Sequence, residues 1–239
     1  MNNDTVFRRI AAMSAIISVP LSLGASFALL SALDFDADIV DNPVSLLMFD
    51  PPIGGTFQVI EFIGLFAYYL MLLPLALYLH NWLKARNERL MPLYTLGGLG
   101  YIFVGSLGSV VLFSALPPLM EAYPQATTED QMAIATAFEA LFDLAVNGFF
   151  VFSSILGSVW WIGLGLILYA SHRFLGIFST VLGIGLLIDA IGTGLQVEAD
   201  AVMSALEAFT FLTQIWVLWM GIVVLRGPGQ NESPNLASS

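Results

Sequence analysis

The chain has 239 residues, of which 58% are hydrophobic and 10% charged, and its mean hydropathy is +0.85. Soluble domains carry about a quarter charged residues, so this composition excludes an ordinary soluble domain and predicts a membrane protein. The absence of cysteine excludes disulfides, thiolate metal sites and cysteine nucleophiles, and two histidines are too few for a three-histidine zinc site. With a net charge of −11, no nucleic-acid partner is expected.

Six long apolar segments predict an all-α, polytopic membrane bundle that forms one domain over residues 1–226. Each segment has at least the roughly 20 residues that cross a hydrocarbon core of about 30 Å. The first is too long for a signal-peptide core, so we expect it to be retained. The predicted spans are residues 6–31, 57–83, 92–116, 148–171, 174–195 and 204–226.

All the basic residues flank these spans on one side. By the positive-inside rule that side is cytoplasmic, which predicts that both termini lie inside a cell membrane of the inner, cytoplasmic type. The C-terminal residues 227–239, rich in Gly, Pro, Ser and Asn, are expected to form a disordered cytoplasmic tail. The basic residues are Arg8, Arg9, Lys84, Arg86, Arg89, Arg173 and Arg226.

The acidic residues divide in the opposite way. Only Asp4, Glu88 and Glu232 share the basic side, and all the others, from Asp34 to Glu207, fall outside or in the outer halves of spans. This predicts an acidic outer face that attracts cations, although adaptation to a salty or acidic exterior would give the same composition.

The two outer connections differ in character. In the first, Asp34, Asp36 and Asp38 have calcium-loop spacing, but Ile39 and Ser45 replace the required Gly and Glu, so we expect a solvated acidic loop over residues 34–56.

The second outer connection predicts an amphipathic helix that begins near Thr128. If it continued unbroken to Ser171 it would be about 60 Å long, twice what a bilayer needs, so we predict a break at Asn147-Gly148. The helix before that break either lies on the outer membrane surface or folds back against the bundle.

Small residues and prolines indicate how the spans pack. Gly and Ser recur along the third and fifth spans, which predicts close backbone packing and places these two helices at the bundle centre. Pro20 and Pro74 lie inside the first and second spans, where each is expected to kink its helix.

Acids and amides at similar depth in the outer halves of several helices are the candidate site. Ionisable groups at membrane depth usually face a bundle interior or a watery cavity, and no Arg or Lys is near enough to neutralise these. We therefore predict an outward-open polar cleft that binds a ligand or ion; capping of helix ends near the water interface is the alternative. No cofactor is predicted, and the identity of any metal is left open. The candidates are Glu61, Glu139, Asp143, Asn147, Asp189, Glu207 and Gln214.

Histidines and tryptophans provide weaker candidates. His80 and His172 each follow a similar apolar string at the cytoplasmic boundary, where they could ligate a haem, contact a lipid headgroup or simply cap a helix. Trp160, Trp161 and Trp216 lie deeper, where they either flank an apolar ligand or pack in the core.

Several strings resemble a bacterial family of uncharacterised six-span membrane proteins, domain of unknown function 4386. They are Leu75 to His80, Gly163 to Ser171, Phe174-Leu175-Gly176 and Val181 to Leu187. The chain departs from that family at His172-Arg173, where Pro is common. The resemblance implies a six-span fold and brings no established activity or catalytic residue.

The leading functional hypothesis is a membrane protein that binds or moves a small solute, cation or proton through the acidic cleft. The bilayer is the expected partner, with a membrane protein or a second copy of the chain as a further possibility. The first alternative is a non-catalytic accessory subunit that contacts another membrane protein or lipid. The second is an intramembrane hydrolase that uses two outer acids; catalysis is the least favoured class.

Overall fold

The structure, a computed structural model, describes residues 3–33, 42–195 and 200–227, without the side chains of residues 200–210. The described secondary structure is helical throughout, as predicted. Within it, five helices are long and apolar enough to cross a membrane, and one apolar helix is shorter. The five are Asn3–Ala32, Gly54–Arg86, Met91–Gln125, Thr128–Leu168 and Arg173–Gly194; the shorter one is Phe211–Arg226. The number of spans and their sidedness stay predictions. The predicted C-terminal tail lies outside the described residues from residue 228 onward.

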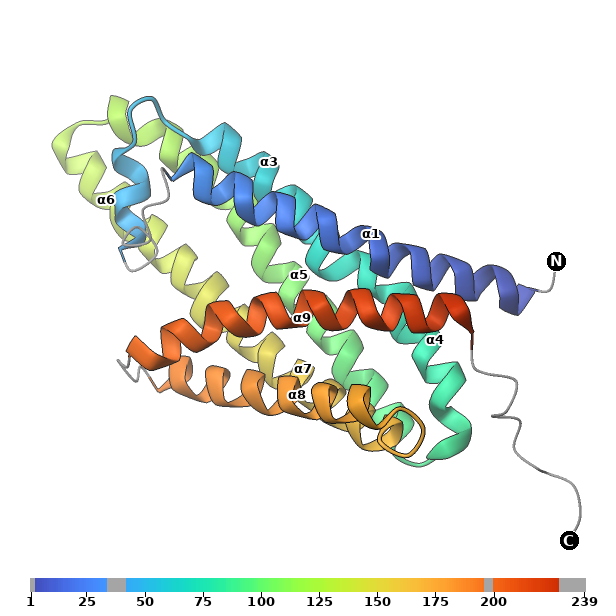
Figure 1. Cartoon of the computed structure of the whole chain (residues 1–239). Helices are drawn as coiled ribbons and strands as arrows, with labels where there is room; N and C mark the ends of the chain where they lie inside the picture. The colour runs from blue at the N-terminus through green and yellow to red at the C-terminus, as the bar shows by residue number, and fades with distance from the viewer. Residues whose placement is uncertain (1–2, 34–41, 196–199, 228–239) are drawn as a thin grey trace, which may run out of the picture.

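The helices pack around a ring in chain order (Figure 1). α1 contacts α3 and α4, these contact α5, α5 contacts α7, α7 contacts α8, and α9 contacts both α8 and α1. The first and last helices therefore close the ring. The bounds are α1 Asn3–Ala32, α3 Gly54–Gly64, α4 Leu73–Leu83, α5 Met91–Ala122, α6 Thr128–Asp143, α7 Val151–Leu168, α8 Arg173–Gly194 and α9 Asp200–Arg226.

The glycine-rich faces of α5 and α8 both contact α7, so the expectation that α5 and α8 together form the centre is wrong. A Cβ atom added at Gly97 of α5 would lie 2.8 Å from the Leu156 carbonyl oxygen, and one added at Gly183 of α8 would lie 2.9 Å from the Ser158 carbonyl oxygen. Small residues permit such backbone contact where lipid supplies no hydrophobic drive. α7 accordingly lies between the two glycine-rich helices.

The second span contains two irregular segments. A π-helical stretch, η2 (Leu65–Tyr69), and a 3-10 turn, η3 (Leu70–Leu72), join α3 to α4, and the 3-10 turn η4 (Lys84–Arg86) follows α4. The irregular segments end just before Pro74, which has no N–H to donate to the preceding turn. By contrast, α1 continues through Pro20 as one helix.

The fourth span is continuous, so the predicted break at Asn147-Gly148 is wrong. A π-helical segment, η6 (Leu144–Phe150), connects α6 to α7 within a helix of 41 residues. In a π-helical turn the backbone is wider by one residue than in an α-helix but stays hydrogen-bonded, whereas a break would leave N–H and C=O groups unpaired. The predicted start is confirmed: α6 begins at Thr128, and the Thr127 hydroxyl accepts a hydrogen bond from the Asp130 N–H at 3.4 Å.

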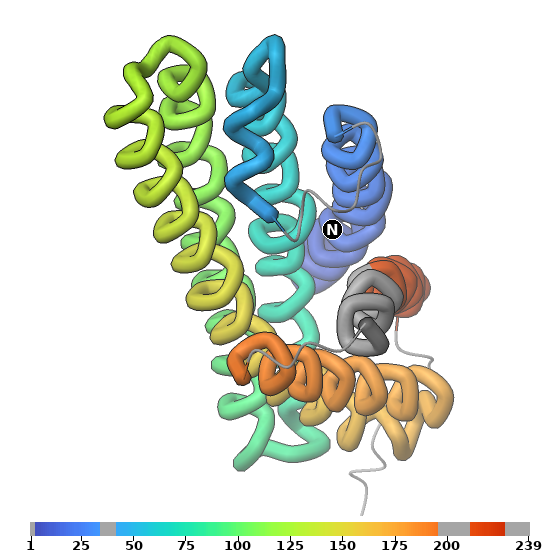
Figure 2. The backbone as a smooth tube through the Cα atoms, turned by 90° about the vertical axis from the view of Figure 1, so that its left-hand side faces the viewer, coloured from blue at the N-terminus to red at the C-terminus, as the bar shows by residue number. Residues whose placement is uncertain are grey.

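α6 folds back against the bundle and forms a second hydrophobic core there. Figure 2 shows it alongside α5. Phe138 of α6 is fully buried near Leu47, which belongs to a 3-10 helix, η1 (Pro43–Met48). The first outer connection is thus partly folded and apolar over this helix, not a solvated loop, because Leu46 and Leu47 are buried. Its predicted calcium-spaced acids lie outside the described residues. The 3-10 turn η5 (Tyr123–Gln125) connects α5 to α6.

Replacement of Gly105 by Ala should destabilise the protein, because the new Cβ would overlap the Tyr69 ring. That ring packs against Tyr101 and Phe150, so a displacement of the ring would disturb both contacts. We expect Gly105→Ala to cost about 1–3 kcal/mol, which thermal unfolding in detergent would detect. The matched control is Gly24→Ala, where no atom lies within 4 Å of the new Cβ. Equal melting temperatures for the two variants would contradict the prediction.

Candidate functional site

A cavity of about 370 Å³ lies inside the helix ring. Residues of α3, η2, α5, η6, α7, α8 and α9 line it, so every segment of the ring except α1 and α4 contributes a wall. Its polar lining consists of carboxylates, amides and hydroxyls, and none of the described lining residues is Lys or Arg.

Three of the predicted site residues line this cavity: Glu61 from α3, Asp189 from α8 and Gln214 from α9. Thr193, one helical turn after Asp189, hydrogen-bonds to its carboxyl group. The Asp189 Oδ1 atom is buried and has no hydrogen-bond partner among the described residues. This leaves one carboxylate oxygen at the cavity able to accept a hydrogen bond or contact a cation.

Gln214 connects the cavity to α1. Its side chain is 7% exposed, and its Oε1 atom accepts a hydrogen bond from the Ser22 hydroxyl at 2.8 Å. The Tyr68 hydroxyl donates to the Ser22 carbonyl oxygen at 3.1 Å and also pairs with the Ser26 hydroxyl. These bonds hold α1, η2 and α9 together along one side of the cavity.

Three other predicted residues face away from the cavity. Glu139, Asp143 and Asn147 are exposed, and the Asn147 Nδ2 atom donates to Asp143 Oδ1 at 3.2 Å. Glu139 and Asp143 of α6 continue with Asn147 of η6 as one exposed stripe, because the opposite face of α6, with Phe138, packs into the second core. The side chain of Glu207 lies outside the described residues, so its relation to the cavity stays a prediction.

Aromatic side chains form a cavity wall that the sequence interpretation missed. The Tyr69 ring centroid lies 5.4 Å from that of Tyr101 and is stacked at 6.3 Å on that of Phe150. All three rings line the cavity, as does Tyr68. The sequence signal was Gly105, one turn from Tyr101, which makes room for the Tyr69 ring from the facing helix.

Both π-helical segments border the cavity. η2 contributes Tyr68 and Tyr69, and η6 contributes Val146 and Phe150. A π-helical turn changes the direction in which later side chains leave the helix, and such turns recur at functional sites. Here the stacking of Tyr69 on Phe150 joins the two irregular segments across the ring.

The tryptophans belong to the core beside this wall. Trp160, Trp161 and Trp216 are fully buried, with ring centroids 4.9–5.9 Å apart. The Trp216 indole N–H donates to the Ser179 hydroxyl at 2.6 Å. None of the three lines a described cavity. This arrangement supports core packing over the alternative of an apolar-ligand site.

The two histidines have different surroundings. His80 Nδ1 hydrogen-bonds to the Thr95 hydroxyl at 2.8 Å, whereas the His172 ring lies 6.1 Å from the Trp82 ring. A bis-histidine haem or a lipid-headgroup contact at these residues stays an untested prediction. Among the described residues, no group of three His, Asp or Glu side chains is placed to hold a metal ion.

Comparison with known proteins gives one match. The model of a family described as a domain of unknown function, DUF4386, matches residues 53–225. The chain belongs to this family. The matched region of this DUF4386 chain includes every described residue that lines the cavity, while α1 precedes it. No curated protein and no solved structure matches the chain.

Cysteine labelling tests whether the cavity is accessible and negative, and the native chain contributes no background thiol. Ser154 and Ser158 lie one turn apart on α7; only Ser154 lines the cavity, and Ser158 is 2% exposed. We expect the Ser154→Cys variant to react at least about fivefold faster than the Ser158→Cys variant. We also expect a cationic thiol reagent to outpace an anionic one at Ser154→Cys, because the cavity carboxylates attract cations. Equal reaction rates of the cationic and the anionic reagent at Ser154→Cys would contradict the electrostatic prediction.

Proposed function

We propose that this membrane protein binds or moves a small cationic solute through the cavity. The observation that carries this proposal is the presence of Glu61 and Asp189 in one cavity whose described lining has no basic residue. Carboxylates in a poorly solvated site need a counter-charge, a proton or water. A bound cation meets that need directly.

The aromatic wall favours an organic cation as the solute. Tyr68, Tyr69 and Tyr101 line the cavity together with the two carboxylates, and the faces of aromatic rings attract ammonium groups. A volume of about 370 Å³ is within the range of small-molecule sites, which begins at roughly 300 Å³. The hydroxyls of Ser109 and Ser153 add polar groups to the same lining.

The proposal includes a topology of six spans with both termini in the cytoplasm of a bacterial cell. In that orientation, Glu61 and Asp189 lie in the outer halves of their spans, and the acidic residues of the outer face would concentrate cations near the cavity. The basic residues Arg8, Arg86 and Arg173 would lie on the opposite side.

The accessory-subunit alternative assumed that glycine-rich helix faces are open to a partner helix. Side chains of the chain itself occupy glycine sites that a partner helix could have used: Trp160 at Gly98 and Ile162 at Gly183. The hydrolase alternative would use Glu61 and Asp189 as its carboxylate pair.

The transport test uses purified protein in sealed vesicles, with a panel of radiolabelled small amines and quaternary ammonium ions. Asp189→Asn and Glu61→Gln keep the shape of each side chain and remove its charge, so each should reduce saturable uptake or binding by about tenfold or more. Asp143→Asn is the matched control, because Asp143 is exposed outside the cavity. Unchanged uptake and binding in both cavity variants would overturn the proposal.

Reporter fusions test the proposed topology. A fluorescent protein at the C-terminus should fold and fluoresce, because it stays in the cytoplasm, and a periplasmic phosphatase fused there should be inactive. The same phosphatase inserted at Gln125, in the turn between α5 and α6, should be active. The reverse pattern would contradict the proposed sidedness.

A further inference from the structure

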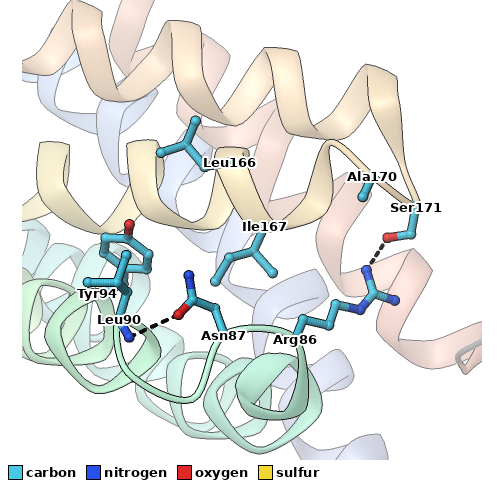
Figure 3. Close-up of a pocket in the computed structure, with 8 residues that line it drawn as sticks. All are labelled: Arg86, Asn87, Leu90, Tyr94, Leu166, Ile167, Ala170 and Ser171. Atoms are coloured by element: carbon cyan, nitrogen blue, oxygen red, sulfur yellow. Dashed lines mark hydrogen bonds between the residues drawn. The ribbon is translucent and has the colours of Figure 1, made fainter. Parts of the chain in front are cut away.

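A groove of about 450 Å³ lies between the α4–α5 connection and the C-terminal end of α7 (Figure 3). Its polar end contains Arg86, Asn87 and Ser171, and its apolar walls include Tyr94 and Leu166. The Arg86 guanidinium reaches across the groove and donates a hydrogen bond to the Ser171 hydroxyl. The positively charged Arg86 side chain is thus held at one end of the groove, whose other walls are mainly apolar.

A second groove, of about 340 Å³, adjoins the first. It runs between α7 and α8, and Leu166 lines both grooves. Its lining is almost wholly apolar, with Ile177 and Val181 on the α8 side. At its end, the Arg173 guanidinium lies 5.5 Å from the centroid of the Tyr169 ring, and Tyr169 lines this groove. Each groove therefore has an arginine at or beside the same end.

The surrounding surface is apolar and exposed. Leu166 is 61% exposed and Phe174 is 79% exposed, so this side of α7 and α8 has the character of a surface covered by lipid chains. The polar ends are strongly basic: Lys84, Arg86 and Arg89 in one connection are opposed only by Glu88, and Arg173 lies at the other connection. This combination complements a molecule with an anionic head and two apolar chains.

We infer that these two grooves form a binding site for one anionic phospholipid. Arg86 and Arg173 bind the phosphodiester group, and one acyl chain lies on each side of Leu166. The Ser171 hydroxyl and the Asn87 amide provide additional hydrogen-bonding groups at the head. Basic pockets between membrane helices are a known type of acidic-lipid site. This site uses none of the residues of the central cavity and does not depend on the proposed function.

Lipid titration followed by native mass spectrometry tests the inference on the full chain in neutral detergent. Phosphatidylglycerol and phosphatidylcholine with identical acyl chains are the probes. We expect phosphatidylglycerol to bind at least about fivefold more tightly, and Arg86→Gln to remove most of that preference. Arg89→Gln is the matched control, since Arg89 is exposed in the same connection and does not line either groove. It should retain the preference.

Two further variants test where the lipid binds, and competition with inorganic phosphate distinguishes a phospholipid from free phosphate. Leu166→Trp should weaken binding of both phospholipids by filling the space between the grooves, while Asp189→Asn should leave lipid binding unchanged. Equal binding of the two lipids, or an unchanged preference in Arg86→Gln, would overturn the inference. Inorganic phosphate that competes fully with phosphatidylglycerol at equal concentration would assign the site to free phosphate and also overturn it.

Discussion

The contact between Tyr69 and Gly105 is the constraint on which the rest of the bundle depends. Any side chain at residue 105 would occupy the space of the Tyr69 ring, so α5 and the second span can approach closely only because this residue is glycine. Once in place, the Tyr69 ring stacks on Phe150 and packs against Tyr101. One side chain thereby links the second, third and fourth spans and forms part of the cavity wall.

The same contact explains why irregular helix accompanies the cavity. Tyr69 ends the π-helical segment η2, and Phe150 ends the π-helical segment η6. In a bilayer every backbone group must be satisfied within the protein, so helices accommodate such distortions and do not break. The Ser22, Gln214 and Tyr68 hydrogen bonds then close the side of the ring where α1 meets α9. Among the described residues, the buried Asp189 Oδ1 atom and the indole N–H groups of Trp160 and Trp161 have no hydrogen-bond partner.

The molecule separates opposite charges along its helices. In the second span, Glu61 lines the cavity near one end and Arg86 lines a groove near the other; in α8, Asp189 lines the cavity and Arg173 lies at the opposite end of the helix. The two carboxylates share their cavity with aromatic rings and hydroxyls, whereas Arg86 lines one groove and Arg173 lies over the Tyr169 ring of the adjoining groove. The two ends of these helices therefore differ in chemistry: carboxylates line the cavity near one end, and arginines lie at the other end.

The sequence by itself determined the helical class, the membrane character and the approximate positions of the long apolar helices, because long apolar runs have few other stable forms in water or lipid. It also gave Glu61, Asp189 and Gln214 as candidates, since polar residues inside such runs are conspicuous. Only the tertiary structure decided that these three line one cavity and that Glu139, Asp143 and Asn147 do not. The reason is that the packing of Phe138 in the second core determines which face of α6 is exposed. The tertiary structure also decided the continuity of the fourth span and the aromatic wall, because Gly105 indicates a close approach but not which ring fills the space. Both follow from contacts between residues far apart in the chain, such as Tyr69 with Phe150.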